Sequence, residues 1–458
     1  MVFGKESVYA ILHLNSGYFK HAWWNNEKDT YAIGLPLVIS NGISHVLFAG
    51  DGKLSLKLFS DIVASRIPVV LIGNTLAPLM FIFLRKWIGN KAAFLASLTY
   101  SLSPISIGMD RWVLHDSFLA LFSFLGIVTF VSALEKGKLS GWPGVWLSLG
   151  FLTKPNGLLV LVFWLALVLQ NRKNKILRKL LLINIGSFLL LTTIVWPASW
   201  SKPVFAIPEY LYRQTKLSTN AGDPIPNFYL GKPTRNPSWS YYLFQFFFRL
   251  PEIIIVFSIF SGFMLLKSNF NESKKLSLTL YIIVFLVFVT LPAVKGGVRY
   301  LLPLLPWVYA LSAWGFCQII NYFDIKIKSL VLSGYLILSI YPLYYHPNYY
   351  LYYNSLIGGP RNAVKYDLVG LCFGSKKALE YLDSNNISGS VAVIGCSDTA
   401  PYHTGRPLTK NWQKADIVIL ESSFKQQFPQ SPSVYSTNDR ILIKSIYENG
   451  VMTATIYR

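Results

Sequence analysis

The stretch from Gly144 to Leu161 reads GVWLSLGFLTKPNGLLVL and decides how the chain folds. It lies in a longer apolar segment, Trp142 to Leu169, which is interrupted by Lys154-Pro155-Asn156. Proline lacks the backbone donor that a helix needs, and it breaks the helix. We therefore predict two short half-helices with Lys154-Pro155 at the turn between them.

Basic segments flank this stretch on both sides. NRKNKILRK, from Asn171 to Lys179, is the most basic run of the chain, and EKGKLSG follows Leu134. Lysine and arginine accumulate in the cytoplasmic loops of membrane proteins. Both flanking loops should therefore be cytoplasmic. The stretch between them must then enter the membrane and return, with the turn at Lys154 facing outward.

The composition indicates a membrane protein. Hydrophobic residues make up 53% of the 458 residues and charged residues only 14%, whereas a soluble chain carries roughly a quarter charged residues. The net charge of +21 comes from basic residues grouped between apolar runs. This pattern is typical of cytoplasmic loops among membrane lipids, and it argues against a nucleic-acid partner.

Further apolar runs have the length of membrane spans, roughly 17–25 residues each. They extend from Pro68 to Leu84, Ala92 to Ile107, Phe118 to Leu134, Leu180 to Val195, Ile253 to Leu266, Leu276 to Val289, Leu301 to Ile320 and Leu330 to Tyr345. With the half-helix pair, about ten spans result. We predict a transmembrane domain over residues 68–345 with an outer loop at 197–251. Residues 1–67 are predicted as an outer amphipathic loop region without a span.

Residues 346–458 are predicted to form a small α/β domain outside the cytoplasm. Its expected elements are a helix from Gly374 to Asn385 and buried strands from Val391 to Gly395 and from Ala415 to Leu420. Asn449-Gly450 predicts a hairpin within Ile441 to Arg458, because Asn-Gly favours tight two-residue turns. The predicted fold class is a polytopic α-helical membrane protein with a small C-terminal extracytoplasmic α/β domain.

The three cysteines do not suggest a disulfide framework. Cys317 falls in an apolar run. Cys372 and Cys396 are able to pair outside the cell, but we expect two free buried thiols.

Charged residues gather where the predicted spans meet the outer face, a position where charge is costly. Asp110, Arg111, His115 and Asp116 lie between two spans. A carboxylate there can act as a general base toward a hydroxyl, and an ordinary polar loop is the alternative.

Three basic residues are expected on the same outer side, Lys154 together with Lys295 and Arg299 of VKGGVRYLLP. Arginine binds phosphate through a bidentate fork and lysine as a point charge. Any one of these basic residues is explained by contact of its long side chain with lipid headgroups. Three basic residues on the same side instead favour binding of an anionic ligand. No cluster of metal ligands is visible among the six histidines, so we predict no metal or other cofactor.

Five segments in order carry a family resemblance. They are MDRWVLHDSFLALF (Met109 to Phe122), the Gly144–Leu161 stretch, NFYLGKPTRNPSWSYYLFQFFFRLPE (Asn227 to Glu252), KGGVRYLLPLLP (Lys295 to Pro306) and YYNSLIGGPRNAV (Tyr352 to Val364). Together they resemble the dolichyl-phosphate-mannose protein mannosyltransferase family. That family includes the bacterial aminoarabinose transferases and lies within the GT-C superfamily of integral membrane glycosyltransferases.

The resemblance implies inverting transfer of a sugar from a polyprenyl-phosphate carrier to a hydroxyl of a protein, lipid or glycan acceptor. An outer-loop carboxylate would take the acceptor proton, and basic residues would hold the leaving phosphate. The implied phosphate-binding residues are Lys154, Lys295, Arg299 and Arg361. The implied sugar- and acceptor-binding residues are Arg111, Tyr229, Trp239 and Tyr300.

The beginning of the chain departs from the family pattern. The family's first outer loop opens with an Asp-Glu pair after a transmembrane helix, and its Asp is the expected base. Here Lys5-Glu6 stands at the matching place, and NNEKDTYAIGLP replaces a His-Pro-Pro segment further on. We expect a truncated or divergent start, and we predict Glu6 or Asp29 as the base with Asp116 as the second acid.

Two other functions stay open at this point. A transporter or flippase of lipid-linked sugars would carry charges deep within several spans and would show repeat symmetry. The charges of this chain instead collect at outer boundaries. A catalytically inactive relative with a binding role would keep the scaffold without the base.

Overall fold

The structure is a computed structural model, and it describes residues 34–48, 61–196, 199–200, 204–219, 226–267, 272–291, 295–368, 372–397, 400 and 404–458. The chain forms two compact units. The first comprises Met1–Asn220, Ile253–Pro292 and Gly296–Tyr341, and the second comprises Ala221–Glu252, Ala293–Lys295 and Pro342–Arg458.

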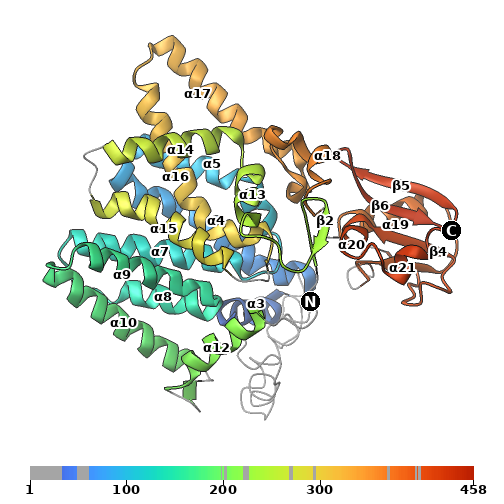
Figure 1. The fold of residues 1–458 in the computed structure, drawn as a ribbon, viewed down its shortest axis with the longest axis horizontal. Coiled ribbons are helices and arrows are strands. Elements are labelled where there is room, and N and C mark those ends of the chain that lie inside the picture. The colour runs from blue at the N-terminus through green and yellow to red at the C-terminus, as the bar shows by residue number, and fades with distance from the viewer. Residues whose placement is uncertain are drawn as a thin grey trace. The chain divides into compact units, whose positions relative to one another are not determined.

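The first unit is built from helices (Figure 1). Its helices are α3 (Leu35–Phe48), α4 (Asp61–Ile88), α5 (Asn90–Ser101), α6 (Pro104–Met109), α7 (Asp116–Glu135), α8 (Trp142–Thr153), α9 (Leu159–Gln170), α10 (Lys175–Val195), α12 (Ala206–Thr219), α14 (Glu252–Lys267), α15 (Glu272–Thr290), α16 (Leu305–Ile320) and α17 (Ile325–Ile340). Two short 3-10 helices, η1 (Pro155–Leu158) and η2 (Val298–Leu304), lead into α9 and α16.

Several of these helices suit a membrane. Within the described residues, five are long and apolar enough to span it: Val63–Ile88, Asp116–Glu135, Lys175–Val195, Val298–Ile320 and Ile325–Tyr345. A bent pair, Tyr241–Arg249 with Glu252–Leu265, adds a sixth if it counts as one span, and three shorter apolar helices accompany them. The polytopic membrane fold is confirmed, although fewer helices meet both criteria than the ten spans expected.

Two segments differ from their expected form. The run from Ala92 to Ile107 is not one helix, because Pro104 starts a new helix and Ser103 caps it by accepting a hydrogen bond from the Ser106 backbone. The segment expected to be a loop region contains α3, a helix of 14 residues. Its sequence, LPLVISNGISHVLF, is apolar on several faces but shorter than a span.

The half-helix pair around Lys154 is confirmed. α8 ends at Thr153, Lys154 takes an extended backbone with φ −155° and ψ 150°, and η1 begins at Pro155. The returning turn packs directly on α8, since a Cβ at Gly157 would overlap the backbone of Gly150. Glycine at position 157 therefore permits η1 to pack against α8.

The second unit contains a four-stranded sheet. Its elements are β1 (Asn227–Tyr229), β2 (Lys232–Thr234), α13 (Tyr241–Arg249), η3 (Tyr341–Tyr345), η4 (Tyr349–Leu351), η5 (Ser355–Ile357), α18 (Gly359–Ala363), α19 (Gly374–Ser384), β3 (Val391–Ile394), β4 (Ile417–Glu421), α20 (Ser422–Gln427), α21 (Pro432–Tyr435), β5 (Leu442–Glu448) and β6 (Val451–Tyr457). The strand order is β3-β4-β6-β5, with β3 and β4 parallel and the other neighbours antiparallel. The predicted helix, buried strands and hairpin are confirmed.

The hairpin and the cysteines show how this unit is held. Asn449 and Gly450 join β5 to β6 with positive φ angles of 50° and 78°, as a tight hairpin turn requires. Cys372 and Cys396 form a disulfide with their Cα atoms 5.6 Å apart. The expectation of two free thiols is therefore wrong. Cys372 precedes α19 and Cys396 follows β3, and both contribute to the apolar core between that helix and the sheet.

Gly157→Ala should destabilise the protein, because the added methyl group has no room against Gly150. We expect a loss of about 1–3 kcal/mol in the free energy of unfolding. Gly186→Ala in α10 is the matched control, since a Cβ there meets nothing within 4 Å, and it should leave stability unchanged or raise it. Thermal unfolding of the purified protein in detergent measures both. Equal stabilities for the two variants would contradict the close approach.

Candidate active site

A buried ion pair joins the start of α7 to the break between α8 and α9. Lys154 Nζ donates a hydrogen bond to Asp116 Oδ1 at 2.5 Å. The side chains are only 15% and 2% exposed, respectively. A charge in such surroundings is costly unless it is paired. The pair thus fixes the first residue of α7 against the polar break that Pro155 creates.

The segment from Lys295 to Pro306 brings two more groups to this pair. Lys154 Nζ lies 4.6 Å from the centroid of the Tyr300 ring, and the guanidinium carbon of Arg299 lies 5.6 Å from the same centroid. Both distances suit cation–π attraction. Arg299 Nε also donates to the Gly296 carbonyl at 2.9 Å. One tyrosine ring therefore contacts two cations.

The two glycines of this segment explain how the Tyr300 ring reaches that place. A Cβ at Gly296 would overlap the Tyr300 ring itself. Gly297 has a φ of +75°, which side chains other than glycine rarely adopt. The spacing KGGVRY is therefore a packing requirement as well as a source of charge.

His115 is next to the ion pair and is neutral at physiological pH. Burial lowers the pKa of its imidazole to about 4, and the charges of Lys154 and Arg299 act in the same direction while Asp116 opposes them. The ring packs so closely on Gly34 that a Cβ there would overlap it. His115 therefore adds no charge to the cluster.

These five residues, His115, Asp116, Lys154, Arg299 and Tyr300, form what we call the Lys154 cluster. Two cations and one carboxylate give it a surplus of positive charge. Asp116 Oδ2 is buried and accepts no hydrogen bond from the described residues. The cluster thus has capacity both to neutralise an anion and to accept a proton or hydrogen bond.

Part of the region that carries this cluster matches a known family. Residues 52–200 match the model of the dolichyl-phosphate-mannose-protein mannosyltransferase family. The family resemblance is confirmed. The matched region includes Asp116 and Lys154 on α7 and at the end of α8. Comparison with curated protein sequences gives no match.

Solved structures share the fold of nearly the whole chain. ArnT from Cupriavidus metallidurans in the apo state gives a TM-score of 0.52 at 12% identity, over 99% of this chain and 92% of that chain. The same protein bound to undecaprenyl phosphate gives 0.52 at 11% identity, with the same coverage. At these identities the likeness establishes the GT-C-type fold.

Four of the predicted site residues, Asp116, Lys154, Arg299 and Tyr300, belong to the Lys154 cluster. Glu6 and Asp29 fall outside the described residues. Arg111 is half-buried on the loop that carries His115 and Asp116, and Arg66 of α4 interacts electrostatically with it.

Four predicted residues belong to the second unit. Lys295 is buried, its Nζ lies 5.8 Å from the Tyr242 ring centroid, and burial lowers its pKa. Arg361 packs against the hairpin turn at Gly450.

Tyr229 and Trp239 are the other two. Tyr229 shares a hydrogen bond of 2.9 Å with Ser240 and packs edge-to-face on Tyr241 and Phe244. Trp239 is 70% exposed. Tyr229 is therefore part of a packed aromatic layer, whereas Trp239 is accessible.

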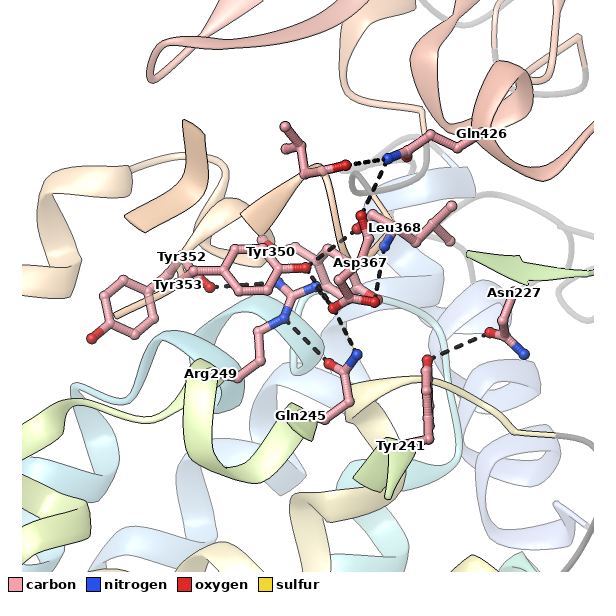
Figure 2. A network of polar contacts seen from close by, with 11 residues as sticks. Asn227, Tyr241, Gln245, Arg249, Tyr350, Tyr352, Tyr353, Asp367, Leu368 and Gln426 are labelled. Carbon is pink, nitrogen blue, oxygen red and sulfur yellow. Dashed lines mark hydrogen bonds and ion pairs between the residues drawn. The ribbon is translucent and has the colours of Figure 1, made fainter. Parts of the chain in front are cut away.

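The second unit also contains a buried polar network that the sequence did not reveal (Figure 2). Arg249 Nη2 lies 3.2 Å from Asp367 Oδ2, with both side chains at most 2% exposed. The same carboxylate oxygen accepts hydrogen bonds of 2.6 Å from Gln245 and from Tyr353. The guanidinium carbon lies 3.7 Å from the Tyr353 ring centroid and 4.6 Å from that of Tyr350.

This network accounts for two of the five family-like segments as packing elements. Asn354 adds to it, because its amide donates to the carbonyls of Phe247 and Leu250 at the end of α13. An arginine after a run of phenylalanines, in FFFRLPE, was the one available signal. The network joins residues 241–250 to residues 349–368.

A double-mutant cycle on Asp116 and Lys154 should give a coupling energy of about 2–3 kcal/mol in stability. Asp116→Asn leaves a partly buried ammonium without its counter-charge, whereas the double variant with Lys154→Met removes the need for one. The control is Glu135–Lys274, a pair of 2.9 Å that involves the other end of α7 and is more exposed, at 27% and 18%. Its coupling should be about 1 kcal/mol or less. Unfolding of the purified variants measures both cycles, and equal couplings would contradict the buried pair.

Proposed function

We propose that the chain is an inverting membrane glycosyltransferase that moves a sugar from a polyprenyl-phosphate-linked donor to an acceptor hydroxyl at the extracytoplasmic face. The observation that carries this proposal is the Lys154 cluster. It combines two cations and a carboxylate with a vacant oxygen, and its Asp116 and Lys154 lie in the region that matches the mannosyltransferase family. A structure of ArnT bound to undecaprenyl phosphate, with the same fold, supports a lipid phosphate as the ligand.

Lys154 and Arg299 are suited to hold the donor phosphate. The ammonium of Lys154 has three donors, and Asp116 takes one of them. Among the described residues, Arg299 donates a hydrogen bond only through its Nε. Both terminal nitrogens can therefore form a bidentate contact with a phosphate. A phosphodiester carries one negative charge and would balance the surplus positive charge of the cluster. Lys295 and Arg361 stay predictions for the same role.

The transfer itself needs a proton acceptor. The acceptor oxygen bonds to the anomeric carbon from the face opposite the phosphate, while the bond from that carbon to the phosphate oxygen breaks and its electron pair leaves with the phosphate. The acceptor proton passes to a carboxylate, for which Glu6, Asp29 and Asp116 are candidates. As charge grows on the phosphate, it competes with Asp116 for Lys154. This competition would release the Asp116 carboxylate from Lys154 and allow it to accept the proton.

Two alternatives predict other arrangements. A transporter of lipid-linked sugars requires charged groups along a path through the spans, whereas the Lys154 cluster is local to one helix break. An inactive relative would bind the lipid phosphate without transferring the sugar.

Variants of the two cations should weaken binding of the lipid phosphate. Lys154→Ala and Arg299→Ala are each expected to reduce affinity for undecaprenyl phosphate by about 10- to 100-fold, since each removes a charge-assisted hydrogen bond. Lys274→Ala breaks a different ion pair in the same unit and should bind as the unaltered protein does. Titration of the protein in detergent with undecaprenyl phosphate measures the affinity. Unchanged affinity in both cluster variants would place the phosphate elsewhere.

The same variants test the reaction. The unaltered protein should release polyprenyl phosphate from polyprenyl-phosphate mannose or from a polyprenyl-phosphate pentose when an acceptor is present. Lys154→Ala should lower that rate by about 100-fold or more, because the lysine stabilises the charge that develops on the leaving group. Binding without release in the unaltered protein, across both donors, would favour the inactive relative.

The extracytoplasmic location of the second unit is also open to test. Its disulfide supports an oxidising compartment, and the exposed basic run after α9 supports a cytoplasmic loop. In a protein with Cys317→Ser, a membrane-impermeant maleimide should label Ser384→Cys in intact cells. It should label Lys173→Cys only after the cells are permeabilised. The reverse pattern would contradict the proposed orientation.

A further inference from the structure

A second buried carboxylate, Asp110, lies at the other end of the loop that carries His115 and Asp116. The Asp110 side chain is almost fully buried, at 9% exposed. Its Oδ2 accepts a hydrogen bond of 3.1 Å from Ser106 Oγ of α6, and its Oδ1 accepts one of 2.5 Å from Ser117 Oγ of α7. Ser117 directly follows Asp116. Asp110 therefore ties the first turn of α7 to the end of α6.

The surroundings of Asp110 show that it does not reach a substrate. A Cβ at Gly73 of α4 would overlap the Asp110 carboxyl group, so α4 closes over it and only glycine leaves enough room. Each of the two carboxyl oxygens already has a serine hydroxyl as its partner. A general base must approach the proton that it removes, and Asp110 is enclosed on these sides.

We propose that Asp110 is a positioning residue for the transfer reaction. Through Ser117 it sets the first turn of α7, and that turn presents the Asp116 carboxylate to Lys154. This inference rests on the proposed function for its catalytic meaning, although the positioning itself does not.

Ser106 and Ser117 lie on different helices and therefore have different structural roles. Ser117 belongs to the helix that begins with Asp116, so its hydrogen bond bears directly on the ion pair. Ser106 belongs to α6, and its hydrogen bond holds Asp110 in place without contacting α7. Removal of either hydroxyl costs one hydrogen bond to the same buried carboxylate. Removal of the Ser117 hydroxyl alone releases the first turn of α7.

The protonation of Asp110 bears on the same contact. Burial raises the pKa of its carboxyl group to about 6, and the hydrogen bonds from Ser117 and Ser106 oppose that rise. Among the described residues, Tyr100 of α5 interacts electrostatically with Asp110. Arg111 follows Asp110 in the chain and interacts with Arg66 of α4, and the pair of Asp116 and Lys154 involves the other end of the loop. Above pH 6 the carboxylate accepts from both serines. Below pH 6 one oxygen carries a proton and becomes a poorer acceptor, so the hold on α7 weakens.

The first experiment needs no enzymatic activity. The coupling energy between Asp116 and Lys154 is measured by the double-mutant cycle in three backgrounds: unaltered, Ser117→Ala and Ser106→Ala. We expect the coupling to fall by at least half with Ser117→Ala and to stay unchanged with Ser106→Ala, although both single variants lose similar stability. Equal couplings in all three backgrounds would overturn the proposal.

The second experiment follows transfer from a polyprenyl-phosphate sugar. Ser117→Ala and Asp110→Asn should lower kcat by about tenfold, as small misplacements of reacting groups do, while affinity for undecaprenyl phosphate stays within about threefold because Lys154 and Arg299 remain. The rate of the unaltered protein should fall as the pH drops through 6, and Asp110→Asn should lack that fall. Equal losses of kcat with Ser106→Ala and Ser117→Ala would contradict positioning. Absence of transfer in the unaltered protein would contradict the proposed function and leave the coupling result to decide on positioning.

Discussion

A lysine in an apolar helix bundle needs a negative partner, and the arrangement around Lys154 follows from that need. Pro155 ends α8 and turns the backbone of Lys154 into an extended conformation. The ammonium then meets Asp116 at the first residue of α7. Three helices are fixed by this one contact, and the polar break between α8 and α9 becomes the place where charge can be tolerated. Tyr300 and Arg299 assemble around it.

Two buried ion pairs among the described residues differ in how fully their carboxylates are satisfied. Asp367 contacts Arg249, Gln245 and Tyr353, and its other oxygen accepts a hydrogen bond from the Leu368 backbone. A carboxylate with partners on both oxygens stabilises one packing arrangement. Asp116 instead keeps one buried oxygen without a partner among the described residues. A buried carboxylate oxygen usually has a partner, so the open oxygen of Asp116 supports its proposed role toward a ligand.

The sequence was informative where local chemistry decides structure. Proline after Lys154 indicated the half-helix pair, Asn449-Gly450 indicated the hairpin, and the apolar segments VAVIG and ADIVIL indicated the buried strands. The sequence also identified Lys154, Asp116, Arg299 and Tyr300, because each lies in a short segment with a family pattern. The sequence did not predict which of these residues contact one another. It also gave no indication that one oxygen of Asp116 lacks a hydrogen-bond partner among the described residues.

What the sequence did not reveal depends on residues that are far apart in the chain. Arg249 and Asp367 are 118 positions apart, and the local sequence around each residue does not predict that the two will pair. The pairing of Cys372 with Cys396 depends on the packing of α19 against the sheet that contains β3, which cysteine spacing alone did not decide. The importance of Gly73 depends on the packing of α4 against Asp110, which the sequence does not show. Glycine carries no functional group, so a search for chemically active residues passes over it.

The overlap between the Tyr300 ring and the space above Gly296 has a consequence for engineering. Replacement of Tyr300 by a small residue would open a hollow that reaches the bare backbone of Gly296, directly beside both cations. The hollow would enlarge the site without removing Lys154 or Arg299. Under the proposed function, libraries aimed at bulkier donor sugars should therefore vary position 300 while position 296 stays glycine, because the size of the proposed site can then be changed while Lys154 and Arg299 remain.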